Sequence, residues 1–406
     1  MRVLLVIGLL AVITLGLGWL LGPRTSAPEL PPQLVGPDAA WLERADQLSA
    51  RRRPLGIASL LLTPIAWWLM IRFGWSAALR AWLEHHIGTN PWIVAAVFTC
   101  IFVFATTLLN GPLAYAGLAL RRSYGLSAET TAAWLVRQGK ELLVSLIVTL
   151  VMVEGLYWLL RVAPQRWWLW AAGGAILGSL LLTYLAPYVI TPLFFTQRPL
   201  EDQTLRTQIM ELGARTGVPI SEVFVIDAST QGNEGNAYFT GIGGATRVVL
   251  YDTLLRQYPK EELLTILAHE LGHWRAQHVW KGLLLTALGA PIGLWIVHLL
   301  LGWLLPGWGI RDRADVAGLP LIMLLATIGG LVTLPVQNWI SRQWEREADR
   351  FALTATGDSA AFQATFVRLA RQNLADPSPP PLYEGLFATH PAIGRRVADA
   401  GSSSSP

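Results

Sequence analysis

The sequence predicts a mainly α-helical, polytopic membrane protein that carries a polar α+β insert and a helical C-terminal segment. Of its 406 residues, 53% are hydrophobic and 14% are charged, whereas soluble proteins carry about 25% charged residues. Its 19 tryptophans are also numerous, and such amphipathic rings concentrate where a bilayer meets water. Seven apolar stretches supply the expected membrane helices.

Each stretch comes close to the roughly 20 mostly apolar residues that cross about 30 Å of hydrocarbon. The stretches are residues 3–21, 55–72, 91–109, 141–160, 167–193, 282–304 and 317–340. We expect the third to end or kink at Asn110-Gly111-Pro112. The first follows Met1-Arg2 and has a signal peptide as its alternative reading. Its length and the lack of a clear cleavage site favour a retained anchor.

Basic residues beside the spans predict the orientation of the chain. Segments 22–54 and 121–140 hold five and four Lys and Arg residues, whereas the three connections on the other side hold two each. We therefore expect the N-terminus outside and the polar segments 194–281 and 341–406 in the cytoplasm. In a bacterium the protein would lie in the inner membrane.

These boundaries divide the chain into five expected parts. The parts are 1–193 (helices one to five), 194–281 (the polar insert), 282–340 (helices six and seven), 341–400 (a C-terminal helical segment) and 401–406 (a disordered tail). Within the first part, the proline-rich residues 23–38 predict an irregular linker.

The insert changes from continuous apolar runs to mixed periodicity. Amphipathic spacing predicts a helix over residues 201–216. Runs of β-branched and aromatic residues predict three strands, at 223–226, 237–240 and 247–251. The glycine-rich residues 241–244 predict a hairpin turn between the last two strands. A further helix begins near Lys260 and carries the first candidate site.

Composition and pattern also exclude some classes of function and weigh against another. Despite the net charge of +4, no basic patch with interleaved aromatic residues is present, so we exclude a nucleic-acid partner. A single cysteine, Cys100, excludes an internal disulfide and a cysteine-rich metal site. A transporter or channel with a structural metal site would show intramembrane charges and internal repeats. Glu154 lies within the fourth span, but no repeat is present.

The run His269-Glu270-Leu271-Gly272-His273 predicts a metal site. Four residues apart on a helix, His269 and His273 project from one face and can share one ion. Catalytic zinc takes three protein ligands and keeps one position open for water. Glu270 is placed to take a proton from that water. An ordinary buried helix with solvated His and Glu is the alternative that this run alone leaves open.

The third ligand should be a distant carboxylate or histidine, and we select Glu345. It opens the run Glu345-Arg346-Glu347-Ala348-Asp349, in which Glu345 and Asp349 share a helix face. Asp349 is placed to accept the other ring N–H of a ligand histidine and so to fix its tautomer. Glu347 points elsewhere and is expected at the surface.

Three further positions have both a functional and an ordinary reading. On a continuous helix His278 lies on the side opposite His269, so we expect it to be structural or interfacial. His390 precedes Pro391 and either occupies a turn or donates to the oxyanion of a tetrahedral intermediate. Asn236 and Ala237 begin a strand that is either ordinary or an edge that pairs with the substrate backbone.

Together these motifs resemble the type I CAAX prenyl endopeptidases, integral-membrane gluzincins with bacterial relatives. The resemblance covers most of the chain. It rests on Pro192-Leu193-Phe194, Pro199-Leu200-Glu201-Asp202, Asn236-Ala237-Tyr238-Phe239, Val249 to Leu255, His269 to Trp274, Ser341 to Asp349, and His390-Pro391. Residues 231–235 depart from the pattern, because the family commonly has a histidine there, and residues 22–54 match poorly.

The resemblance implies one zinc ion per chain, on His269, His273 and Glu345, with Glu270 as the catalytic base. It also implies seven helices around a large intramembrane chamber, with the zinc near its cytoplasmic side. It gives further roles to Asp349 behind the ligands, to His390 at the transition state with Arg396 nearby as a substrate-binding residue, and to Asn236 and Ala237 along the substrate backbone.

We therefore expect a zinc metalloendopeptidase that hydrolyses peptide bonds without a covalent intermediate. An HtpX-type quality-control protease is the runner-up, but seven spans and a large insert favour the prenyl-protease architecture. The expected partners are the lipid bilayer and a peptide or protein substrate, including a lipidated or membrane-embedded one. We expect the protein to be a monomer.

Overall fold

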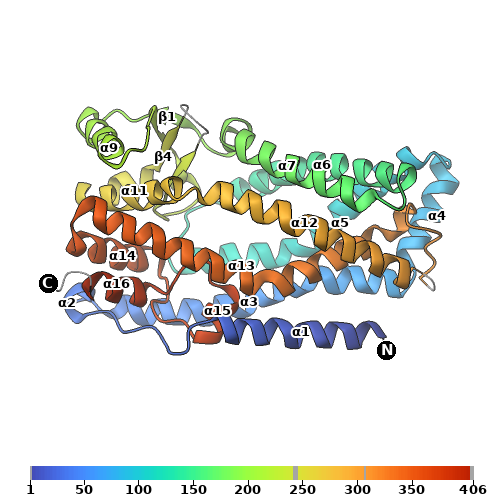
Figure 1. The fold of residues 1–406 in the computed structure, drawn as a ribbon, viewed down its shortest axis with the longest axis horizontal. Coiled ribbons are helices and arrows are strands. Elements are labelled where there is room, and N and C mark those ends of the chain that lie inside the picture. The colour runs from blue at the N-terminus through green and yellow to red at the C-terminus, as the bar shows by residue number, and fades with distance from the viewer. Residues whose placement is uncertain (1, 241–245, 306–307, 403–406) are drawn as a thin grey trace.

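The structure is a computed structural model that describes residues 2–240, 246–305 and 308–402, with the backbone alone for residues 2–9. Its long helices lie side by side along the longest axis of the molecule (Figure 1). They are α1 (Arg2–Leu21), α3 (Ala40–Arg72), α5 (Pro91–Ser123), α6 (Thr131–Val162), α7 (Trp167–Leu185), α12 (His278–Leu304) and α13 (Leu319–Thr356).

Six helices in the described part of the chain are long and apolar enough to cross a membrane, and they contain the second to seventh predicted spans. The fifth of the predicted spans continues from α7 through a π-helical turn (Ala186–Ile190) into α8 (Thr191–Phe194). Only Leu10–Leu21 of the first span is described with side chains. The prediction of a seventh membrane helix therefore stays a prediction.

Helix α1 nevertheless packs closely on the C-terminal half of the chain. A methyl group on Gly385 of α15 (Pro381–Phe387) would overlap the carbonyl oxygen of Gly18, and one on Gly22 would lie 2.9 Å from the Gly385 Cα. Glycine at these positions is what allows the two backbones to approach so closely. The retained anchor itself stays a prediction.

The third span was expected to end or kink at Asn110-Gly111-Pro112, and it does not end there, because α5 continues as one helix to Ser123. The Asn110 Nδ2 donates to the hydroxyl of Thr63 on α3 and to the carbonyl of Thr106, at 2.8 Å each. Polar groups that neighbouring helices satisfy in this way are tolerated within a membrane helix, and so is a proline such as Pro112.

The predicted boundary at residue 341 also lies within a helix. Helix α13 is a single 38-residue element that carries the seventh span and the Glu345 run without interruption. It ends at Gly357, whose φ of 66° stops the helix in the left-handed conformation. The Glu345 run therefore has a fixed position relative to the membrane bundle.

A four-stranded sheet lies at one end of the molecule, opposite α4 (Trp75–Ile87) (Figure 1). All three predicted strands are present, as β2 (Glu222–Ile226), β3 (Ala237–Thr240) and β4 (Arg247–Tyr251), and β1 (Gln197–Pro199) joins them. The order is β1-β2-β4-β3, in which β2 and β4 are parallel and β3 is at an edge. The predicted hairpin turn at 241–244 lies outside the described residues.

Several helices form a core with this sheet at that end, and α11 (Lys260–Arg275) lies against β3. The helices are α9 (Gln203–Thr216), α10 (Asp252–Gln257), α11, α14 (Ser359–Asn373) and α16 (Ile393–Ser402). Their apolar faces share one buried cluster with the sheet, including Ile209, Leu250, Leu267, Phe362 and Val397. Because α16 includes Gly401 and Ser402, the expected disordered tail does not begin at residue 401.

The linker predicted at 23–38 is not irregular throughout. It contains a short helix, α2 (Pro32–Val35), and α3 begins at Ala40, well before the second span. Leu30, Val35 and Trp41 are buried in the same cluster as the sheet. Apolar residues of this segment gain more by joining that core than by remaining in water.

Candidate metal centre

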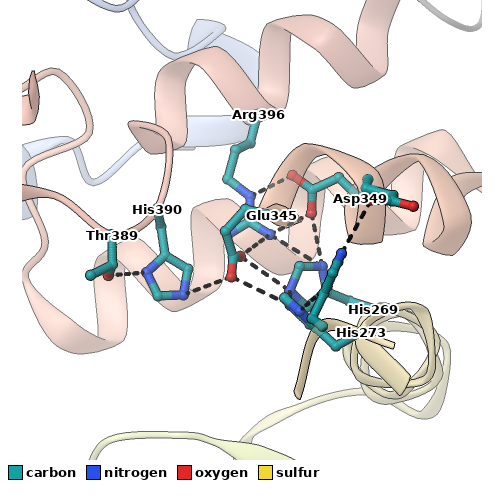
Figure 2. Close-up of polar contacts among 9 residues, drawn as sticks. His269, His273, Glu345, Asp349, Thr389, His390 and Arg396 are labelled. Atoms are coloured by element: carbon teal, nitrogen blue, oxygen red, sulfur yellow. Dashed lines mark hydrogen bonds and ion pairs between the residues drawn. The ribbon is translucent and has the colours of Figure 1, made fainter. Parts of the chain in front are cut away.

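Helices α11 and α13 cross at the junction between the membrane bundle and the sheet. The side chains of His269 and His273 project from one face of α11 toward Glu345 of α13 (Figure 2). Gly272 makes this approach possible, because a Cβ there would lie 3.0 Å from the Ala348 Cα and 3.2 Å from its carbonyl oxygen. Any larger residue at position 272 would push the two helices apart.

Three groups that can bind a cation converge at this crossing. The His269 and His273 Nε2 atoms are 3.1 Å apart, and each is 3.3 Å from an oxygen of the Glu345 carboxylate. One ligand atom from each residue lies within 4.8 Å of the others. Facing lone pairs on two imidazoles beside a buried carboxylate call for a cation or a proton between them. The donor set therefore fits a metal ion such as zinc.

Asp349 lies directly behind His269. Its Oδ1 is 2.9 Å from the His269 Nδ1, and it also accepts two hydrogen bonds from Arg396, one of them from Nε to Oδ2 at 2.8 Å. The Arg396 guanidinium is 6% exposed and stacks 3.8 Å from the Phe366 ring centroid. These contacts fix the Asp349 carboxylate and leave the His269 Nε2 directed at the site. The predicted contact of Arg396 with substrate stays a prediction.

The same contacts change the proton affinity of His269. Burial lowers its pKa, but hydrogen bonds to Asp349 and Glu345 outweigh this effect and raise its pKa to about 9. In metal-free protein this ring is therefore an imidazolium at neutral pH, with hydrogens on both nitrogens, and a metal ion must displace one of them.

We expect the apparent metal affinity to fall about tenfold per pH unit as the pH drops below about 9, because one proton is released on binding. The raised pKa stabilises the metal-free fold at pH below about 6.5, and this contribution is lost as the pH rises through about 9. Titration with buffered zinc at pH 7, 8 and 9, with melting curves in chelator, checks both trends. A pH-independent affinity would contradict the assignment of His269 as a ligand.

Glu270 follows His269 on α11 and is partly buried. Among the residues that the structure describes, no hydrogen-bond partner occupies its carboxylate. Burial raises its pKa above the usual range of a glutamic acid, although the neighbouring His269 and His273 oppose that shift. A carboxylate with a raised pKa and no competing partner is suited to act as a general base.

His390 lies across the site from α11, with its Nε2 3.4 Å from the Glu345 Oε1. Its side chain is 59% exposed and so is accessible to a substrate. The Nδ1 lies 2.8 Å from the hydroxyl of Thr389 (Figure 2). If that hydroxyl donates to Nδ1, the ring hydrogen is on Nε2 and points into the site.

His390 lies in the loop between α15 and α16, residues 388–392. Sequence analysis missed the residues that hold this loop in place. Arg342 of α13 is buried and donates to the carbonyl oxygens of Glu384 and Ala388, at 2.9 and 2.7 Å. Asn338 donates to the Leu386 carbonyl at 2.6 Å, and the Glu384 carboxylate accepts from the backbone N–H of Ala392 at 3.1 Å. The loop is therefore fixed on both sides of His390.

The strand predicted at residues 237–240 is present next to the motif helix. Asn236 precedes β3, and Ala237 is its first residue. Because β3 is at the sheet edge, one of its sides pairs with no other strand of the described residues, and an extended peptide can pair there. The rings of Phe239 and Trp274 meet edge to face at 6.0 Å, which ties β3 to α11.

A continuous helix would place His278 on the side opposite His269, and that prediction is wrong. Helix α11 ends at Arg275, and Gln277 adopts a left-handed conformation with φ of 57°. The chain therefore turns before α12, and the His278 ring returns to lie beside His273, with 2.9 Å between their Nδ1 atoms. Glu347 is at the surface as predicted, although its Oε2 lies 3.2 Å from the His278 Nε2.

Comparison with known proteins gives matches along nearly the whole chain. The profile of peptidase family M48 matches residues 199–403, and that of the CAAX prenyl protease N-terminal part, with five membrane helices, matches residues 26–196. The uncharacterized metalloprotease YhfN of Bacillus subtilis is 30% identical over 373 residues, which cover 89% of this chain and 87% of that protein.

More distant relatives agree with these matches. The probable CAAX prenyl protease 1 of Schizosaccharomyces pombe is 28% identical over 344 residues, covering 81% of this chain and 70% of that protein. The crystal structure of S. mikatae Ste24p superimposes with a TM-score of 0.83 at 20% identity, covering 98% of this chain and 96% of that one. That superposition shows a common fold.

Proposed function

Since this chain belongs to peptidase family M48, we propose that it hydrolyses peptide bonds with one zinc ion held by His269, His273 and Glu345. It is an integral, multi-pass membrane metalloendopeptidase that resembles the CAAX prenyl proteases. The observation that carries the proposal is the convergence of the three ligand groups within 4.8 Å of one another. Two histidines and one carboxylate, with a position left open, are typical of catalytic zinc.

When bound, the zinc polarises the attacking water and the scissile carbonyl group. Glu270 accepts the proton of that water and then gives it to the leaving amine. Its partial burial and its free carboxylate support this role. Asp349 holds His269 in the tautomer that presents Nε2 to the site.

His390 donates from Nε2 to the oxyanion that develops on the scissile carbonyl. Its position beside Glu345 and its exposure support this role. The edge strand β3, with Asn236 and Ala237 at its start, holds the substrate backbone in an extended conformation. Extended binding places one peptide bond of the substrate between Glu270 and His390.

Replacing His390 with alanine should lower kcat about 10²- to 10³-fold, because one oxyanion donor is lost. Thr389→Val keeps the shape of its side chain but removes the hydroxyl that orients the ring, so its effect on kcat should be smaller. Steady-state kinetics of both variants, with bound zinc measured in each, check the prediction. Loss of zinc equal to the loss of activity in His390→Ala would contradict a role in transition-state binding.

An apolar cavity beside the site supports a substrate that carries a lipid. It has a volume of about 1150 Å³ and is lined mainly by side chains of α12 and α13, with Trp68 of α3 and Leu10 of α1. It reaches Thr389, next to the proposed oxyanion donor. We propose that it is part of a chamber among seven membrane helices that receives the lipid of the substrate.

The experiment compares three substrates of the purified protein: a farnesylated peptide, the same peptide without the lipid, and casein. We expect zinc-dependent cleavage with the highest kcat/KM for the farnesylated peptide, because the apolar cavity binds the lipid. Casein cleaved as fast as the farnesylated peptide would favour the quality-control alternative. No chelator-sensitive cleavage of any of the three would contradict the proposed function.

We further propose that the chain acts as a monomer with its active site on the cytoplasmic side. The basic segments 22–54 and 121–140 support this orientation. Helix α11 and the sheet lie together at the end of the molecule opposite α4 (Figure 1). A protease-cleavable tag at the C-terminus should resist protease added outside intact cells and be removed only after lysis.

A further inference from the structure

The turn between α11 and α12 brings a third histidine to the site. Gln277, with φ of 57° and ψ of 37°, is one of two residues other than glycine with positive φ in the described chain. This left-handed conformation is unfavourable for an L-residue, so other contacts must compensate for it. The contact it permits is the one between the rings of His273 and His278.

A line of hydrogen-bonding groups runs from His273 to the surface. The His273 Nδ1 is 2.9 Å from the His278 Nδ1, and the His278 Nε2 is 3.2 Å from the Glu347 Oε2. The His278 ring is 5% exposed, whereas the Glu347 side chain is 45% exposed and also lies 3.6 Å from the Lys281 ammonium group. The line therefore ends on a carboxylate that water and Lys281 keep charged.

Only one arrangement of hydrogens satisfies every group in this line. When the His273 Nε2 faces the metal position, its hydrogen is on Nδ1 and must be donated. The nearest acceptor is the His278 Nδ1, which then carries no hydrogen itself. The His278 hydrogen is therefore on Nε2, where the Glu347 carboxylate accepts it.

A second contact fixes the plane of the His278 ring. The indole of Trp344 stacks on it with a centroid distance of 4.9 Å and an angle of 11°. Trp344 precedes the ligand Glu345 on α13, so the helix that supplies the third ligand also fixes this ring. His273 is thereby oriented through His278, as His269 is oriented by Asp349.

We propose that His278, anchored by Glu347, is a positioning residue that fixes the tautomer and the ring orientation of His273 for metal binding. This proposal rests on the proposed function, because it assumes that His273 is a ligand. Its consequence is that His278 affects metal affinity without touching the metal or the substrate. Partners of this kind are worth about 10- to 100-fold in metal affinity.

The experiment measures zinc affinity by competition with a chelating dye, using the full-length protein in detergent and no substrate. His278→Phe keeps an aromatic ring on Trp344 but removes both nitrogens. His278→Asn keeps an acceptor close to the place of Nδ1, and Glu347→Gln removes only the charge of the anchor. The matched controls are His298→Phe, a histidine of the same helix that bonds to Trp167, and Glu141→Gln, a carboxylate with the same 45% exposure that pairs with Arg137.

We expect His278→Phe to weaken zinc binding about 10- to 100-fold and to release zinc faster, with Glu347→Gln in the same direction but smaller. His278→Asn should restore most of the affinity, and both controls should match the wild type. Unchanged affinity in His278→Phe, or equal losses in His278→Phe and His278→Asn, would overturn the proposal.

Melting temperatures of the variants and zinc binding by the wild-type protein separate a loss of metal affinity from unfolding and from failure of the proposed function. Melting temperatures in chelator should be similar for His278→Phe and His298→Phe, so a difference in zinc affinity does not reflect unfolding. A drop in melting temperature confined to His278→Phe and equal in size with and without zinc would show a purely structural role and overturn the proposal. A wild-type protein that binds no zinc would instead contradict the proposed function.

Discussion

Replacing Glu270 with glutamine should lower kcat about 10³- to 10⁴-fold, at the upper end of what general-base catalysis contributes. The amide keeps the size of the side chain but cannot accept the proton of the attacking water. Zinc should remain bound, because the three ligand groups are those of His269, His273 and Glu345. Single-turnover cleavage of the lipidated peptide, with zinc content measured on the same sample, checks both parts.

The matched control is Glu261→Gln, an exposed glutamate in the first turn of the same helix. It should leave kcat unchanged, since it lies two turns from the metal centre. Cleavage retained at the wild-type rate in Glu270→Gln would show that another group takes the proton, and the mechanism would be wrong.

Replacing Glu345 with glutamine should weaken zinc binding by more than about 100-fold, beyond the 10- to 100-fold attributed to partners outside the ligand set. The reason is that Glu345 is the one carboxylate among the three converging groups, and it neutralises part of the metal charge. Asp349→Asn instead removes the negative charge of the group beside the His269 Nδ1 and should fall within the 10- to 100-fold range. Equilibrium dialysis against buffered zinc measures the zinc affinity of both variants.

The informative result is which of the two substitutions weakens zinc binding more. A weaker effect for Glu345→Gln than for Asp349→Asn would mean that Asp349, and not Glu345, completes the ligand set. Both variants should keep the wild-type secondary structure by circular dichroism. The ligand residues lie on helices whose remaining contacts with the core are unchanged.

The helix faces that carry the proposed ligands could be predicted, because each face follows helical periodicity. His269 and His273, like Glu345 and Asp349, are four residues apart, so any unbroken helix places each pair on one face. Helices α11 and α13 are unbroken at these positions. The pairing of the two helices came from the combination of the motifs, which local sequence does not encode.

His278 could not be placed correctly, because its position depends on the backbone of a single residue. A glutamine gives no signal for a left-handed turn, which glycine or asparagine would have given. Continuing the helix through Gln277 rotates His278 away from the site. The observed turn brings it back to His273.

The third span also continues beyond the place where an end or a kink was expected, for a related reason. Asn110 and Pro112 are helix breakers in water, but Thr63 on the neighbouring helix accepts the Asn110 amide. Likewise, the hydrogen bonds from Arg342 to the carbonyls of Glu384 and Ala388, which hold the segment before His390, join residues more than 40 positions apart. Long-range partners of this kind leave no periodic pattern in a sequence.

The central claim is that zinc lies between α11 and α13, and anomalous scattering at the zinc absorption edge from crystals of the zinc-loaded protein tests it most directly. We predict a single peak about 2.0–2.2 Å from the Nε2 atoms of His269 and His273 and from an oxygen of Glu345. A fully occupied peak elsewhere, or one that contacts the two histidines without Glu345, would contradict the account.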